Sequence, residues 1–184
     1  MRNYIKIANK YIEDVLSNKI PTCRYVKQAC QRQVKDLKRK SWAYHFDITL
    51  ACRVCKFIEA LTHVKGPKAG ENIKLEPWQI FILTTVFGWV DKNNLRRFQQ
   101  VYIEVPRGNG KSALSSGVGL YMLCADNEKG ADVYSFATTR DQAKIVFGDA
   151  QAMARANQPL KDCFGFVSYT HLRAQRPRLI SYAV

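Results

Sequence analysis

The stretch that decides the fold is Pro106-Arg107-Gly108-Asn109-Gly110-Lys111-Ser112. An alternating run of β-branched and polar residues, 100–105, precedes it, and a run of small and apolar residues without proline, 111–124, follows it. These patterns predict a strand, a loop and a helix, in that order. Glycine-rich loops in this setting bind phosphate, because backbone N–H groups and the positive end of the helix converge on the anion.

The residue types within the loop predict a site for a nucleoside triphosphate. Gly108 and Gly110 allow the backbone to approach the phosphates closely. We expect the Lys111 ammonium to lie on the β- and γ-phosphates and the Ser112 hydroxyl to bind Mg²⁺. The standard Walker A pattern has a glycine where this chain has Val105. An ordinary glycine-rich turn that caps a helix is the alternative reading.

The charge of the chain points to a polyanionic partner. Its 184 residues carry 29 Lys and Arg against 15 Asp and Glu, a formal net charge of +14. Such an excess favours nucleic acid as a partner without distinguishing DNA from RNA. The longest nearly apolar stretch, 80–90, is about half as long as a membrane-spanning helix. We therefore expect no membrane segment, and, since the chain starts with an amphipathic pattern, no signal peptide.

The first third of the chain predicts helices. Apolar residues recur at helical spacing over 4–16 and again over 23–37, and Asp47 is well placed to cap a third helix that runs to about residue 64. The face opposite the second apolar stripe is basic, which fits either a solvated surface or a nucleic-acid contact. That basic face comprises Arg24, Lys27, Arg32, Lys35, Lys38, Arg39 and Lys40.

The rest of the chain predicts an α/β unit. A loop rich in glycine and lysine, 65–71, is the best internal boundary. A second strand is expected over 131–138, followed by a helix whose start fits a capping box between Thr139 and Gln142. Strand, helix, strand and helix of these lengths predict a parallel sheet with right-handed crossovers.

The pair Cys52 and Cys55 has the spacing of two metal ligands. The surrounding apolar residues repeat at helical spacing, however, and the sequence has no second pair of this kind to complete a four-cysteine zinc site. Buried free thiols are therefore the favoured interpretation.

Several further motifs follow one another along the chain. They are Phe57-Ile58-Glu59, Leu75-Glu76-Pro77-Trp78-Gln79, Phe87-Gly88-Trp89, the loop from Val105 to Ser112, and Ala137-Thr138-Thr139-Arg140-Asp141-Gln142-Ala143. In this order and spacing they resemble the ATPase part of the large terminase subunit of tailed bacteriophages, over residues 57 to 160. In that family the phosphate loop commonly departs from the standard Walker A pattern and carries an upstream basic residue, as at Arg107.

The resemblance implies an α/β fold of the P-loop NTPase type (RecA/ASCE-like). We expect a partial parallel sheet with helices on both faces, preceded by a helical region. The implied domains are an N-terminal helical region, 1–70, and the N-terminal part of the ATPase domain, 71–164. The final segment, 165–184, has no acidic residue and no longer follows the family pattern, so we interpret it as an atypical, non-native tail.

The resemblance also implies a function: a subunit of an ATP-driven motor that threads double-stranded DNA into a capsid through a portal protein. Such subunits form a homo-oligomeric ring, work with a small terminase subunit, and act in the cytoplasm of a bacterium that is infected by the phage or carries the prophage. We expect this chain to lack the Walker B acid and the nuclease domain. The only later apolar run that ends in an acid, 145–149, has helical periodicity. Alone, the chain should bind nucleotide weakly and hydrolyse it poorly.

Site residues are carried over from the family one by one. Gln79 resembles an adenine-reading glutamine, because a side-chain amide can pair with the adenine edge; a solvent-facing helix residue is the alternative. Arg107 would brace the γ-phosphate, acting in catalysis with Lys111, although an arginine that faces DNA or supports the backbone fits as well. The expected ATP-binding set is Gln79, Gly108, Asn109, Gly110, Lys111 and Ser112, with Ser112 as the Mg²⁺ ligand.

Two other functions fit parts of the sequence. One is a helicase-like ATPase stimulated by nucleic acid, which the spacing of Gln79 and Lys111 allows. The other is a basic nucleic-acid-binding module that carries a vestigial phosphate loop. The segment 138–142 resembles a helicase-like element that couples nucleotide to DNA, but capping of the following helix already explains Thr139 and Gln142.

Overall fold

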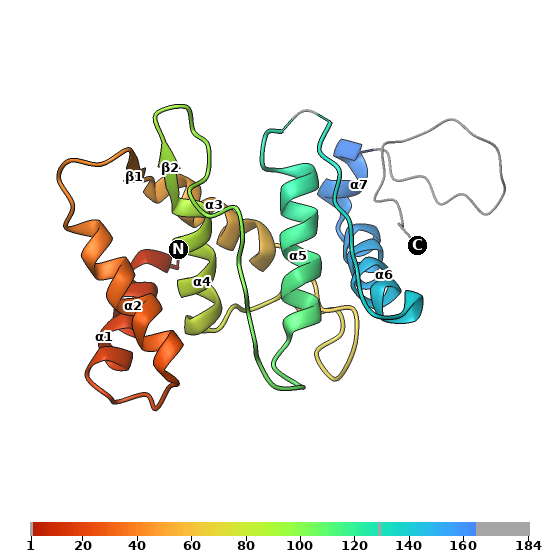
Figure 1. Cartoon of the computed structure of the whole chain (residues 1–184). Coiled ribbons are helices and arrows are strands. Elements are labelled where there is room, and N and C mark those ends of the chain that lie inside the picture. Colours follow the sequence, from red (N-terminus) through yellow and green to blue (C-terminus); the bar gives the residue numbers. More distant parts are fainter. Residues whose placement is uncertain (1, 129, 165–184) are drawn as a thin grey trace, which may run out of the picture. The chain divides into compact units, whose positions relative to one another are not determined.

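The computed structural model describes residues 2–128 and 130–164, and the expected tail, 165–184, lies outside them. The chain divides into two compact units (Figure 1). The first combines Met1–Lys56 with Leu75–Ile103, and the second combines Phe57–Lys74 with the described residues from Glu104 onward. The domain boundaries at 70 and 164 remain a prediction. In the part of the chain that the structure describes, no helix is both long and apolar enough to cross a bilayer.

The first unit is built on helices α1 (Tyr4–Leu16), α2 (Arg24–Leu37) and α4 (Pro77–Gly88), with most of α3 (Ile48–Glu59). The two helices predicted for the first forty residues are confirmed. Their apolar stripes meet α4 in a core that contains Ile12, Val15, Cys30 and Phe81. Asn3 caps α1, because its side-chain oxygen accepts the Lys6 N–H at 2.9 Å.

Helix α3 begins as predicted and ends early. The Asp47 carboxylate accepts the Leu50 N–H at 2.9 Å and so caps the first turn. The helix stops at Glu59 instead of about residue 64. The chain beyond it pairs with the segment around residue 72 instead, with backbone hydrogen bonds of 2.8 Å from His63 to Glu71 and from Ile73 to Leu61. These bonds satisfy backbone groups that a longer helix would have used internally.

A small two-stranded antiparallel sheet, which the sequence analysis missed, pairs β1 (Tyr44–Phe46) with β2 (Trp89–Asp91). Trp89 anchors it to α2, since its indole N–H donates to the Gln33 side-chain oxygen at 2.7 Å. A second link is the ion pair between Arg97 and the buried Asp36, at 2.6 Å. The Arg97 guanidinium also stacks on Trp42, 4.3 Å from the ring centre.

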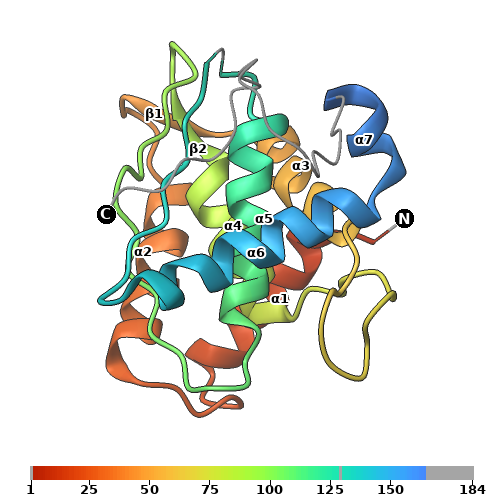
Figure 2. The ribbon, with the colours of Figure 1, turned by 90° about the vertical axis from the view of Figure 1, so that its right-hand side faces the viewer.

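The second unit holds α5 (Lys111–Cys124), α6 (Arg140–Ala156) and α7 (Gln158–Phe164). Helix α6 crosses α5 and packs on it (Figure 2). The Ser116 hydroxyl of α5 donates to the Val146 carbonyl of α6 at 2.8 Å. Gly117 allows a close approach on α5, because a Cβ there would lie 3.2 Å from Ile58. The fully buried side chains of this core include Tyr121, Leu120 and Met153.

The two strands predicted around the loop are wrong for this structure. Residues 100–105 and 131–138 carry no strand, and the only sheet in the described residues is the antiparallel β1–β2 pair. A strand needs a hydrogen-bonded neighbour, and an alternating pattern alone does not supply one. Tyr102 is 86% exposed and Phe136 73% exposed. The predicted parallel sheet is therefore not confirmed.

Five cysteines are free thiols: Cys23, Cys30, Cys52, Cys55 and Cys124. Cys30 and Cys55 are buried, as expected for packing residues, and Cys52 is half-buried. Burial raises the pKa of the Cys30 thiol to about 11. Within residues 2–128 and 130–164, no group of three or more His, Cys, Asp or Glu side chains could hold a metal ion.

Candidate functional site

The glycine-rich segment forms an exposed turn that leads directly into α5. Gly110 occupies the N-cap position with φ 70° and ψ 19°, and Gly108 has φ 85°. Both are left-handed conformations, which glycine adopts at little cost and other residues adopt rarely. The two glycines thus shape the loop through their backbone angles.

The start of α5 is open to a ligand. No side chain caps this helix. The first N–H groups of any helix lack acceptors within it and carry the positive end of the helix dipole. Residues 106–111 are exposed, and a Cβ built on Gly108 would meet nothing within 4 Å. An anion can therefore approach the loop backbone, which is what a triphosphate site requires.

Two side chains close the loop on itself. The Lys111 ammonium reaches back from α5 and donates to the Val105 carbonyl oxygen at 3.1 Å. The Asn109 amide donates to the Pro106 carbonyl at 3.3 Å. The Lys111 side chain thus spans the loop that is expected to bind the nucleotide phosphates. Arg107 is exposed at the same turn.

Ser112 lies at the second position of α5, half-buried, where its hydroxyl suits a Mg²⁺ that accompanies the phosphates. The acid that would complete such a site is not supplied by the run 145–149. Asp149 lies inside α6, where it is buried and paired with Lys65 at 2.6 Å. The helical reading of that run is confirmed. The loop N–H groups and Lys111 fit a triphosphate, and Ser112 fits the role of one Mg²⁺ ligand.

Gln79 has a structural partner that the sequence analysis missed. It is the third residue of α4, and its side-chain oxygen accepts the Glu76 N–H at 2.9 Å, while the Glu76 side chain accepts the Gln79 N–H. This reciprocal pair is a capping box, and the spacing of Glu76 and Gln79 ahead of an apolar run could have indicated it. Gln79 is only 8% exposed, so it is not a solvent-facing residue. It belongs to the first unit, and the loop belongs to the second.

The start of α6 forms half of its predicted capping box. The Thr139 hydroxyl accepts the Gln142 N–H at 3.4 Å. The Gln142 side-chain oxygen accepts the Thr138 hydroxyl at 2.8 Å instead of reaching back to the Thr139 backbone. Arg140, the first residue of α6, is exposed.

The basic face predicted on α2 lies at the surface. Arg24, Lys35 and Lys38 are exposed, and α2 carries its buried residues on the other side. Two members of the face stack on aromatic rings, Arg32 over Phe98 and Arg39 over Trp42. The face forms a candidate surface for nucleic acid.

An exposed glycine-rich turn with two left-handed glycines, followed by a lysine at an uncapped helix start, has the features expected of the phosphate-binding loop in P-loop nucleotide-binding proteins. Comparisons with known proteins agree. Residues 77–164 match the family model "Terminase large subunit, ATPase domain". The match confirms the resemblance stated above, because over these residues the chain is similar to the ATPase domain of terminase large subunits.

One curated relative is the terminase large subunit of Enterobacteria phage HK97. It is 29% identical over 112 residues, which cover 60% of this chain. The aligned region is 21% of the relative, so the chain spans a minor part of that protein. No solved structure matches the chain significantly.

Proposed function

We propose that this chain carries nucleotide-binding machinery of a DNA-packaging motor, the large terminase subunit of a tailed phage. In that protein, ATP hydrolysis drives the translocation of double-stranded DNA. The observation that carries the proposal is the open loop at the uncapped start of α5, which lies within the family match.

In this proposal different loop residues bind the phosphates and the Mg²⁺. The backbone of Gly108, Asn109 and Gly110 and the ammonium of Lys111 hold the phosphates, and the Ser112 hydroxyl ligates Mg²⁺. When bound, Mg²⁺ supplies positive charge that offsets the charge of the phosphates.

Two further roles stay proposals about single side chains. Arg107, exposed beside the loop, supports charge on the γ-phosphate during transfer. Gln79 reads the adenine edge through its amide, in addition to its place in the α4 cap.

The finer fold and the assembly belong to the same proposal. The P-loop fold implies a parallel sheet with helices on both faces. The partners are double-stranded DNA, the portal protein, a small terminase subunit and further copies of the large subunit in a ring. The place of action is the cytoplasm of the bacterial host.

The test is a titration of the chain with a fluorescent ATP analogue, with and without Mg²⁺. We expect weak, Mg²⁺-dependent binding that Lys111→Ala reduces about 10- to 100-fold, because a charge-assisted contact to phosphate is lost. Lys144→Ala on α6 is the matched control and should bind like the unchanged chain. Equal binding by the two variants would contradict the proposed site. Rapid Mg²⁺-dependent turnover by the chain alone would contradict the expectation that it hydrolyses ATP poorly.

The exposed basic face of α2 favours DNA as a partner, and a second titration tests it. Binding of a short DNA duplex should weaken steeply with salt, because bound cations are released from the phosphates. The double change Lys35→Glu and Lys38→Glu should weaken it at every salt concentration. Duplex binding in a chain that binds no nucleotide would favour the basic module with a vestigial loop.

A further inference from the structure

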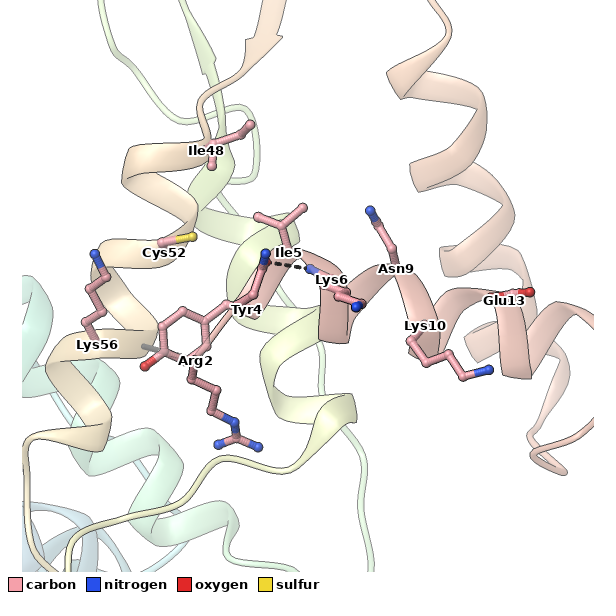
Figure 3. Close-up of a pocket in the computed structure, with 11 residues that line it drawn as sticks. Arg2, Tyr4, Ile5, Lys6, Asn9, Lys10, Glu13, Ile48, Cys52 and Lys56 are labelled. Carbon is pink, nitrogen blue, oxygen red and sulfur yellow. Dashed lines mark hydrogen bonds between the residues drawn. The ribbon is translucent and has the colours of Figure 1, made fainter.

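The first unit contains a groove that the nucleotide site does not use. It has a volume of about 810 Å³ and lies between one face of α1 and one face of α3 (Figure 3). Ile48, Cys52 and Lys56 follow one another along α3 on its wall. Residues spaced by four positions share one face of a helix, so α3 presents a continuous stripe to the groove.

The rim of the groove is strongly basic. Four cationic side chains line it, against a single acid, Glu13. Arg2 donates to the Leu75 carbonyl at 2.9 Å, and Lys10 pairs with Asp14 at 3.0 Å. Within the described residues the ammonium groups of the other two have no ion-pair partner. These two are Lys6 and Lys56, one on each wall.

Part of the groove wall is apolar. Ile48 is 59% exposed, although it is a large hydrophobic side chain on a regular helix. A smaller cavity of about 160 Å³ adjoins the groove, and Ile5, Asn9 and Ile48 line both. For comparison, a cavity of about 150 Å³ holds a benzene ring in another protein. The small cavity thus has room for one aromatic side chain.

The small cavity also offers an unused hydrogen-bonding group. Thr85 of α4 lines it and is 5% exposed. Its hydroxyl has no hydrogen-bond partner within the part of the chain that is described. A buried hydroxyl without a partner costs free energy, so the cavity favours an occupant with a polar tip. Thr84, the neighbouring residue, satisfies its own hydroxyl on the Ile80 carbonyl at 2.8 Å.

We propose that this groove binds an acidic amphipathic helix of a partner protein, which inserts a tyrosine side chain into the small cavity. The basic rim complements acidic residues, and the exposed Ile48 complements an apolar helix face. Tyrosine combines an aromatic body with a hydroxyl for Thr85, and such residues anchor many protein interfaces. A DNA backbone would match the charge but would leave Ile48 uncovered and the cavity unfilled. All groove residues lie in the first unit, so this inference does not rest on the nucleotide site.

The test uses the whole 184-residue chain and synthetic glutamate-rich amphipathic helical peptides that differ only at one central apolar position. Fluorescence anisotropy compares peptides with tyrosine, phenylalanine or alanine there, together with a lysine-rich peptide and a DNA duplex. We expect the order tyrosine, phenylalanine, alanine, with tyrosine about 3- to 10-fold tighter than phenylalanine. The lysine-rich peptide should not bind.

Variants assign the binding to the groove. Ile48→Glu, and the pair Lys6→Glu with Lys56→Glu, should each weaken the tyrosine peptide about tenfold or more. Leu95→Glu, which changes another exposed apolar residue of the same unit, and the α2 pair Lys35→Glu with Lys38→Glu are matched controls and should leave it unchanged. Thr85→Val keeps the side-chain shape and should abolish the preference for tyrosine over phenylalanine.

Thermal melting checks that each variant folds, and Thr85→Val should not lower the melting temperature because its hydroxyl makes no bond in the free chain. The proposal is overturned if no acidic peptide binds, or if the groove variants and the controls behave alike. It is also overturned if the DNA duplex displaces the peptide and loses affinity with Ile48→Glu, which would make the groove a nucleic-acid site.

Discussion

Helices α4 and α5 begin in opposite ways. At the start of α4, Glu76 and Gln79 satisfy each other's backbone N–H groups, and Pro77 follows the cap. At the start of α5, a left-handed Gly110 stands at the cap position and no side chain caps the helix. The α4 start is buried at Gln79, whereas the turn before α5 is exposed.

This difference separates a structural helix start from one that is available to a ligand. At a capped start the backbone N–H groups donate to the protein's own side chains, so the start stabilises the helix and has few free donors for an anion. An uncapped start keeps these groups for a phosphate. The open α5 start thus supports the phosphate site, and the closed α4 start makes any nucleotide role of Gln79 an addition to its cap.

The largest effect on this difference between the two helix starts is expected at Gly110. Gly110→Ala should lower the free energy of unfolding by about 1–2 kcal/mol, because its φ of 70° is unfavourable for a residue with a Cβ. Gly148→Ala, inside α6 and with nothing within 4 Å of the new Cβ, should instead raise it by about 0.5–1 kcal/mol. Urea unfolding measures both. Equal effects would mean that the loop conformation is not the one described.

A second change of about 1 kcal/mol tests the α4 cap. Glu76→Ala and Gln79→Ala each remove one half of the capping box, so both should lower the free energy of unfolding by similar amounts, and the double variant should cost less than their sum. Only Gln79→Ala should reduce a preference for ATP over GTP in the nucleotide titration. If both variants leave that preference intact, Gln79 is a capping residue alone.

The smallest effect is expected at α6. Thr139→Ala removes a long capping bond of 3.4 Å, so we expect a loss of about 0.5 kcal/mol, at the low end for caps. The bond from Thr138 to Gln142 should persist, and Thr138→Ala provides the comparison. A loss above about 2 kcal/mol in urea unfolding of Thr139→Ala would show that this threonine does more than cap the helix.

Much of the helical structure could be predicted, because apolar spacing and caps are local signals. The stripes of α1 and α2, the cap at Asp47 and the helix after Thr139 all depend on residues within a few positions of each other. The pairing of β1 with β2 could not, because Tyr44 pairs with Asp91 across 47 positions of sequence (91 − 44). The prediction of two strands around the loop failed for the same reason. A strand forms only by hydrogen bonding to a neighbouring strand, and no local sequence pattern identifies that neighbour.

The candidate site divides in the same way. The loop from Gly108 to Ser112 was predicted because glycine, lysine and serine at fixed spacing have a direct chemical meaning. The bond from Lys111 to the Val105 carbonyl and the burial of Gln79 depend on how the chain folds around these residues. Neither could be found from spacing alone.

The second unit is discontinuous, and this affects the order in which the protein can fold during synthesis. Residues 57–74 leave the ribosome before 75–103, yet they pack with residues from 104 onward. The carbonyl of Ala60 receives its hydrogen bond from Asn157, a residue made 97 positions later. The first unit can therefore fold before the residues that pack on 57–74 have been synthesised. During that interval Ile58 and Leu61, which are buried in the complete chain, are exposed to chaperones and to aggregation.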